Sequence, residues 1–168
     1  QEASERALRQ IRGATVVHAV IPLLRSQDAV VRNIAMDVLR EIGVDDLTTL
    51  TKLLYDPDPD IRIFIADILG SSDSSIAPLC DVLLHDPEVN VRYQAAVSLG
   101  ELRRPEAVES LRQALGDEEW VQYAVMEALA KIKDGSCVDV LVQALDNCSP
   151  LVASTVLDAL GEINSVKS

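Results

Sequence analysis

The sequence contains few aromatic residues: one tryptophan, three tyrosines and one phenylalanine among 168 residues. The core must therefore be aliphatic, and a surface that stacks nucleic-acid bases on aromatic rings is not expected. Basic residues are scarce as well, because 15 lysines and arginines stand against 27 acids and leave a formal net charge of −12. This charge argues against nucleic acid and against an anionic membrane as partners.

Cysteine and histidine are nearly absent, which limits metal and redox chemistry. Cys80, Cys137 and Cys148 cannot all pair within one chain and show no CxxC spacing, so neither a disulfide framework nor a zinc site is expected. A reducing, cytoplasmic compartment is the simplest interpretation. His18 and His85 form no cluster with a nucleophile or with metal ligands. We therefore expect no catalytic residue, no metal, no cofactor and no enzymatic activity.

Long hydrophobic runs are missing too. No stretch approaches the ~18 apolar residues that a membrane-spanning helix needs. Hydrophobic residues nevertheless make up 48% of the chain, which is typical of a folded domain. The chain begins at Gln1 without an initiator methionine, so we expect it to be part of a longer protein.

The dominant feature of the sequence is a repeat with a period near 30 residues. Each copy has an apolar anchor, usually followed by arginine, then small apolar residues, then a leucine eight positions after the anchor. The anchors and their leucines are Val31 with Leu39, Ile61 with Leu69, Val91 with Leu99, Val121 with Leu129, and Val152 with Leu160. A second leucine marker precedes each copy at the same period, at Leu24, Leu54, Leu84, Leu115 and Leu145. Two independent markers with one period make chance a poor explanation.

Each copy is expected to form two helices. After the anchor Val91, apolar side chains recur at Ala95, Leu99 and Leu102, a spacing that places them on one helical face. One such pair cannot bury its stripe alone, whereas stacked neighbours share a continuous core. The predicted fold is all-α, an α-α superhelix that forms a solenoid of about five helical hairpins after an N-terminal helix. We predict one domain over residues 1–168, with a partial repeat at 1–12 and full repeats at 14–43, 44–73, 74–103, 104–133 and 134–164.

The VRxxAAxxLGxL pattern at this period, preceded by an LLxD ending, resembles HEAT repeats. It is most similar to the short subtype named for phycobilisome (bilin) lyase subunits. The resemblance implies a right-handed superhelix whose second helices line a concave face.

The resemblance also implies a ladder between repeats, in which an aspartate before each second helix pairs with an arginine six residues later. Two pairs match this pattern: Asp56 with Arg62, and Asp86 with Arg92. In the fourth repeat Gly116 and Gln122 replace both members, and the turn is one residue shorter. We therefore expect the ladder to be interrupted after the third repeat. Asp117 is expected to cap the following helix, and Trp120 to fill the altered turn.

The face of the second helices that lies opposite the apolar stripe is a candidate binding surface. Its positions combine acids with tyrosines and aliphatic side chains: Asn33, Asp37, Ile63, Asp67, Tyr93, Val97, Tyr123, Glu127 and Asp158. In the geometry that the resemblance implies, they form an acidic groove with an apolar-aromatic centre that binds a basic or amphipathic protein segment. Alternatively, the acids form an ordinary solvated helix face and the tyrosines lie flat on neighbouring repeats.

Two functional hypotheses follow. The first is a non-catalytic scaffold for protein–protein interaction that binds its partner on the acidic face. The second, which rests on the repeat subtype alone, is a bilin lyase-like subunit or a chaperone that handles a tetrapyrrole on a partner protein. Val156 and Leu157 leave an apolar edge near the C-terminus, so end-to-end self-association is also allowed for.

Overall fold

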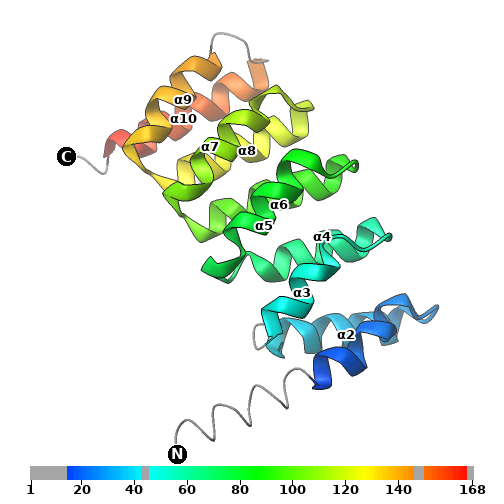
Figure 1. Cartoon of the computed structure of the whole chain (residues 1–168). Coiled ribbons are helices and arrows are strands. Elements are labelled where there is room, and N and C mark those ends of the chain that lie inside the picture. Colours follow the sequence, from blue (N-terminus) through cyan, green and yellow to red (C-terminus); the bar gives the residue numbers. More distant parts are fainter. Residues whose placement is uncertain (1–14, 43–45, 146–149, 166–168) are drawn as a thin grey trace, which may run out of the picture. The chain divides into compact units, whose positions relative to one another are not determined.

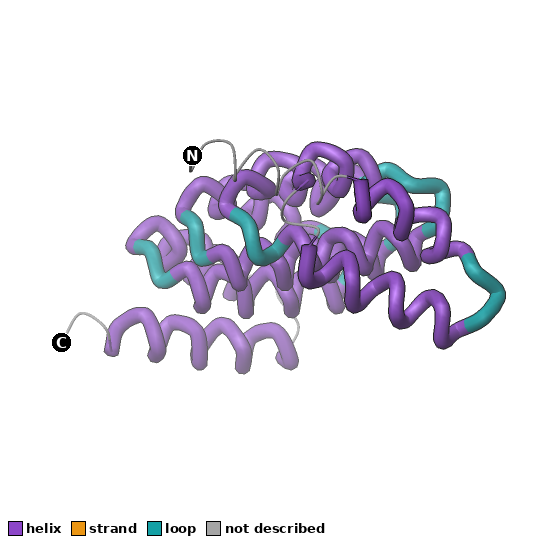
Figure 2. Tube along the Cα trace, turned by 90° about the horizontal axis from the view of Figure 1, so that it is seen from below, coloured by secondary structure: helices purple, strands orange, loops and turns teal. Residues whose placement is uncertain are grey.

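The computed structural model describes residues 15–42, 46–145 and 150–165, and the regular elements in these ranges are helices joined by short loops (Figure 1, Figure 2). The predicted all-α class is confirmed. No helix among the described residues is long and apolar enough to span a membrane. The partial repeat expected at residues 1–12 lies outside the described part of the chain.

The chain divides into two compact units, residues 1–69 and 70–168, and each is described by itself. The single domain and the repeat boundaries expected from the sequence stay predictions.

Unit 1 contains two helical hairpins. Residues 15–20 are α-helical and continue into a 3-10 segment, η1 (Ile21–Arg25), where Pro22 removes a backbone donor from the helix. Helix α2 follows as Ala29–Ile42. The second hairpin consists of α3 (Leu47–Leu53) and α4 (Pro59–Leu69).

Aspartates begin the second helices of unit 1. Asp28 Oδ1 accepts a hydrogen bond from the N–H of Val30 at 2.8 Å, and Asp58 Oδ1 accepts one from the N–H of Asp60 at 3.0 Å. These bonds satisfy first-turn N–H groups that have no partner inside the helix.

Unit 2 contains three hairpins in two layers (Figure 1). The first helices are α5 (Ile76–His85), α7 (Val108–Gln113) and α9 (Gly135–Leu145). The second helices are α6 (Val89–Leu102), α8 (Glu119–Ile132) and α10 (Pro150–Ser165). Short 3-10 segments precede or follow the first helices: η3 (Asp73–Ser75), η4 (Pro105–Ala107) and η5 (Ala114–Gly116). Helix α8 packs on α6 and on α10, so the second helices form one continuous layer.

The core of each unit is aliphatic, as the scarcity of aromatic residues requires. The anchors Val91 and Val121 are fully buried, and so are the leucines Leu99 and Leu129 that follow them. Leu39 and Leu69 are equally inaccessible in unit 1. The leucines eight positions after the anchors of the first four repeats are therefore core positions, since burial of these side chains drives the helices together.

Helices α6 and α8 approach each other closely at Gly100, which is buried. A Cβ atom added there would lie 2.8 Å from the Cα of Ala128 and 3.0 Å from its Cβ. Backbone atoms of α8 cannot yield to such a contact without shifting the helix. Gly100 thus sets the spacing of the two second helices. Gly161, one residue beyond the repeat leucine of α10 as Gly100 is in α6, has open space around it.

We predict that Gly100→Ala destabilises the protein by about 1–3 kcal/mol, because the added methyl group forces α6 and α8 apart. Chemical denaturation of the variant measures the effect. Gly161→Ala is the matched control: its methyl group meets no neighbour, and the gain in helix propensity raises stability by up to about 1 kcal/mol. Equal effects of the two substitutions would contradict the packing role of Gly100.

Candidate functional site

Five residues of the predicted binding face lie in unit 2. Tyr93 and Val97 come from α6, Tyr123 and Glu127 from α8, and Asp158 from α10. The first four are partly exposed, whereas Asp158 is exposed. Because α6 and α8 pack directly together, the four residues on these helices share one face, which we call the tyrosine face.

Tyr123 and Glu127 are joined across one helical turn. The Tyr123 hydroxyl donates a hydrogen bond to Glu127 Oε1 at 3.0 Å. This bond and the negative charge of Glu127 raise the pKa of Tyr123, and the nearby Tyr93 acts in the same direction. The Tyr123 hydroxyl therefore remains a protonated donor at neutral pH, and it orients the Glu127 carboxylate.

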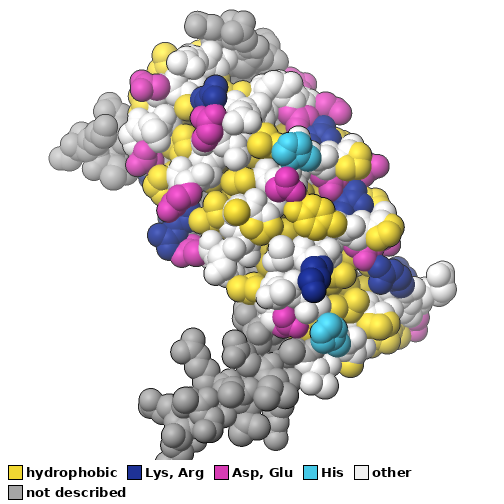
Figure 3. Space-filling view, viewed as in Figure 1, with side chains coloured by type: hydrophobic (Ala, Val, Ile, Leu, Met, Phe, Trp, Pro, Cys, Tyr) yellow, Lys and Arg dark blue, Asp and Glu magenta, His cyan; other side chains and the backbone are white. Residues whose placement is uncertain are grey.

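A basic residue compensates one acid at the margin of this face. The Nζ of Lys131 in α8 lies 2.8 Å from Glu101 Oε1 in α6. This hydrogen bond and the lysine charge lower the pKa of Glu101. The other side of unit 2 is mixed in the same way, since acidic side chains over α5 and α7 lie beside basic ones (Figure 3).

Four predicted site residues lie in unit 1. Asn33 and Asp37 are exposed on α2, and α4 carries the half-buried Ile63 and the exposed Asp67. The Nη2 of Arg40 donates to Asp67 Oδ2 at 2.9 Å, and its Nη1 lies 3.9 Å from Asp37 Oδ1. The acids of this group are thus partly neutralised.

Arg40, which is not among the nine predicted site residues, also belongs to this surface. Besides its two carboxylate neighbours, its guanidinium carbon lies 5.4 Å from the centre of the Phe64 ring, a distance at which cation–π attraction operates. The sequence could have indicated this role, because Arg40 lies on the same helical face as Asp37. It also lies one repeat before Asp67. The assignment of all nine residues to a binding site stays a prediction.

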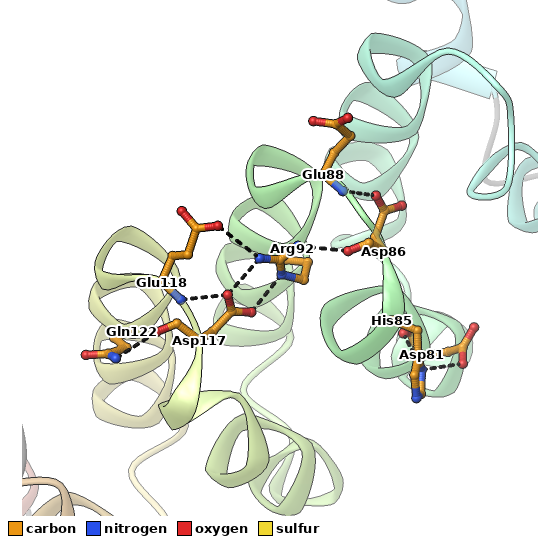
Figure 4. A network of polar contacts seen from close by, with 8 residues as sticks. All are labelled: Asp81, His85, Asp86, Glu88, Arg92, Asp117, Glu118 and Gln122. Carbon is orange, nitrogen blue, oxygen red and sulfur yellow. Dashed lines mark hydrogen bonds and ion pairs between the residues drawn. The ribbon is translucent and has the colours of Figure 1, made fainter.

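In the first three repeats, a hydrogen bond from the arginine after the anchor holds the preceding turn. In the third repeat, Arg92 Nη1 donates to the backbone oxygen of Asp86 at 2.8 Å (Figure 4). The same bond recurs from Arg32 to Ser26 at 2.7 Å, and from Arg62 to Asp56 at 2.8 Å.

The predicted interruption of the ladder after the third repeat was wrong. Arg92 Nε and Nη2 donate to the two carboxylate oxygens of Asp117, each at 2.7 Å, which makes a bidentate pair (Figure 4). Gln122 Nε2 donates to the backbone oxygen of Asp117 at 2.7 Å. Asp117 and Gln122 thus take the two ladder positions. The shorter turn moves the aspartate one residue later, from 116 to 117.

Two further expectations about the turns need correction. Asp117 does not occupy the cap position of α8, because Glu118 does, although Asp117 Oδ1 accepts from the N–H of Glu118 at 2.6 Å. Trp120 does not fill the turn, since it is 68% exposed. The buried side chain at this turn is instead Ala114, in η5.

His85 lies exposed on the surface of α5. The Nδ1 of His85 lies 3.0 Å from Asp81 Oδ1, one turn back on the same helix and on the surface (Figure 4). Within residues 15–42, 46–145 and 150–165, no group of three or more His, Cys, Asp or Glu side chains is placed to hold a metal ion.

Two protein-family models match the chain. The model for HEAT repeats matches residues 47–121, and the model for the PBS lyase HEAT-like repeat matches residues 121–147. The chain belongs to the HEAT-repeat family. The repeat at residues 121–147 is of the phycobilisome lyase type, and together with the similarity to a bilin biosynthesis protein it confirms the resemblance seen in the sequence motifs.

One relative and one solved structure are similar to this HEAT-repeat chain. It is 35% identical over 116 residues to the bilin biosynthesis protein PecE of Mastigocladus laminosus, a match that covers 63% of this chain and 43% of the relative. The chain therefore spans less than half the length of that protein. A crystal structure of an engineered protein matches with a TM-score of 0.54 at 22% identity, over 90% of this chain and 81% of the other. That likeness concerns the fold alone, and it supports the predicted helical-repeat solenoid.

The expectation that the chain has no enzymatic role was wrong. The relative is a bilin biosynthesis protein, and the last matched repeat is of the PBS lyase type. Scarcity of histidine and cysteine does not exclude a role in catalysis, because the reacting groups can come from the substrate or from a partner. The same findings favour the bilin lyase-like hypothesis over the generic scaffold.

The Arg92–Asp117 pair is the best-shielded ion pair of the ladder in unit 2, with side chains 14% and 15% exposed. Burial raises the pKa of the Asp117 carboxyl, but hydrogen bonds from Arg92 and from the N–H of Glu118, together with the arginine charge, bring this pKa below its ordinary value. The pair thus stabilises the fold fully above the unfolded-state pKa of about 4, and this contribution is lost as the pH falls through the lower folded-state pKa.

We predict that Asp117→Asn destabilises the protein by about 1–3 kcal/mol at pH 7, because Arg92 loses its charged partner. The difference from the wild type shrinks as the pH falls from about 4, the unfolded-state pKa, toward the lower folded-state pKa at which Asp117 itself takes up a proton. Urea denaturation at several pH values measures both effects. Glu109→Gln is the control, because its pair with Arg112 is exposed and contributes little. Equal stability of the two variants at pH 7 would contradict the role of Asp117.

Proposed function

We propose that this chain is the HEAT-repeat part of a bilin lyase-type protein and takes part in attaching a bilin to a partner protein. The observation that carries the proposal is the 35% identity over 116 residues to a bilin biosynthesis protein. The PBS lyase HEAT-like repeat at residues 121–147 supports the same assignment independently.

We assign the contact with the partner protein to the tyrosine face. The matched PBS lyase-type repeat contributes Tyr123 and Glu127, and the matched HEAT segment contributes Tyr93 and Val97. Partly exposed tyrosines beside an aliphatic side chain are the type of anchor found at the centre of protein interfaces. Gly100 supports this arrangement, because it fixes how closely the two helices that carry these residues approach each other.

The charge of this face favours a basic or amphipathic segment of the partner. Glu127 is held in place by the Tyr123 hydroxyl and has no basic partner among the described residues, so its carboxylate is available to a cation from outside. Glu101 is already paired with Lys131, and a partner must compete with that pair. A contact of this kind steers the approach of the partner and sets its register.

The proposal is tested by co-expression in a bacterial host that makes a bilin and a phycobiliprotein subunit as its acceptor. We predict that the chain increases the covalently bound bilin on the acceptor, measured by bilin fluorescence of the acceptor band after denaturing electrophoresis. No increase over the host without the chain would contradict the proposed function.

The tyrosine face is tested in the same assay with the double variant Tyr93→Ala, Glu127→Lys. We expect it to lower the bilin signal at least about tenfold, as the loss of an interface anchor and of its charge implies. The matched control is Asp139→Lys, a charge reversal at an exposed position of the first helix α9. Equal loss in the double variant and the control would show that net charge, and not this face, is responsible.

A further inference from the structure

Unit 1 contains a cavity of about 640 Å³ between η1, the turn that follows it, α2 and the start of α4. This volume is in the range of small-molecule sites. Its lining combines apolar side chains, two arginines, two aspartates and two neutral polar residues: Leu24, Met36, Ile61, Phe64, Arg25, Arg32, Asp58, Asp60, Ser26 and Gln27.

Arg32 in this cavity holds the same repeat position as Arg92. Each places Nη1 on the backbone oxygen six residues earlier, at 2.7 Å in Arg32 and 2.8 Å in Arg92. The other two nitrogens of Arg92, Nε and Nη2, donate to Oδ2 and Oδ1 of Asp117, each at 2.7 Å.

The corresponding edge of Arg32 is unoccupied. Within the described ranges, neither Nε nor Nη2 of Arg32 has a hydrogen-bond acceptor or an ion-pair partner. The aspartate that opens the next turn, Asp56, is instead bound by Arg25. A half-buried guanidinium fork that lines a cavity without a carboxylate is a ready site for one, because this planar pair of donors matches both oxygens.

We propose that the Arg32 fork binds a carboxylate of a small molecule seated in this cavity. The identity of that molecule rests on the proposed function: it is the propionate of a linear tetrapyrrole. The proposal adds a small-molecule site in unit 1 to the protein contact assigned to unit 2.

The rest of the lining fits the other parts of such a ligand. Ile61 and Phe64 line the cavity with apolar edges, each only 4% exposed, where a conjugated ring system can make apolar contact. Asp58 and Asp60, which stand at the start of α4, supply acceptors for pyrrole N–H groups. The ligand therefore needs a carboxylate at the α2 side and N–H donors at the α4 side, which a bilin offers on one molecule.

The test measures the affinity of the purified chain for biliverdin and for biliverdin dimethyl ester, which lacks both carboxylates, by absorbance titration. We predict that the free acid binds at least about tenfold more tightly than the ester, as expected for a charge-assisted bidentate contact. The variant Arg32→Gln weakens binding of the acid by a similar factor and leaves binding of the ester unchanged.

Glutamine is a suitable replacement because Gln122 already makes the turn bond at the equivalent position of the fourth repeat. Arg32→Gln thus removes the fork while it keeps a side-chain N–H donor for the hydrogen bond to the turn. Arg112→Gln is the control, since it removes the same charge from an exposed site outside the cavity. It should change neither affinity.

Equal affinity of the wild type for acid and ester, or equal weakening of both ligands by Arg32→Gln, would overturn the cavity site while leaving bilin binding and the proposed function intact. Absence of binding for both ligands would overturn the cavity site as well. The proposed function then stands or falls by the bilin found on the acceptor in co-expression.

Discussion

One hydrogen bond, repeated at four successive turns, ties the first turn of the second helices α2, α4, α6 and α8 to the chain before it. The bond uses one nitrogen of the side chain: Nη1 where the donor is arginine and Nε2 where it is glutamine. The side-chain donor and the backbone carbonyl acceptor are, in chain order, Arg32 to Ser26, Arg62 to Asp56, Arg92 to Asp86, and Gln122 to Asp117. Where the donor is arginine, the remaining nitrogens are left for a second partner. The stacking of repeats and the chemistry of the turns both depend on what that partner is.

The fold could be predicted because its cause is periodic. A stripe such as Val91 and Leu99 recurs every 30 residues, and burial of each stripe needs its neighbours, so pattern and packing agree. The turns were less predictable, because alignment by position assumes equal length. A turn shortened by one residue placed Gly116 at the expected ladder position, whereas in space Asp117 reaches Arg92. A repeat motif does not contain the path of the backbone. Only that path shows which residue of a shortened turn reaches the arginine.

The candidate binding face was predictable as a set of positions but not as an electrostatic field. Helical period assigns Asp67 and Glu101 to the polar side of their helices, yet each is paired with a long basic side chain from a neighbouring repeat, Arg40 and Lys131. These contacts join residues 27 and 30 positions apart, and they exist only because stacking places the helices side by side. Counting acids along one face therefore overestimates its negative potential, since adjacent repeats bring their own cations to it.

The two proposed contacts respond to salt in opposite directions. A basic segment on the tyrosine face is attracted by a chain of net charge −12, so added salt screens that attraction and weakens the contact. A ligand carboxylate at Arg32 approaches the same acidic chain against a repulsive field, and salt screens the repulsion. The guanidinium contact itself is short-range and half-buried, so it is screened less than the field around it. In the proposed site, recognition of an acid by so acidic a chain therefore depends on one local cation: Arg32, whose fork meets no aspartate among the described residues of unit 1.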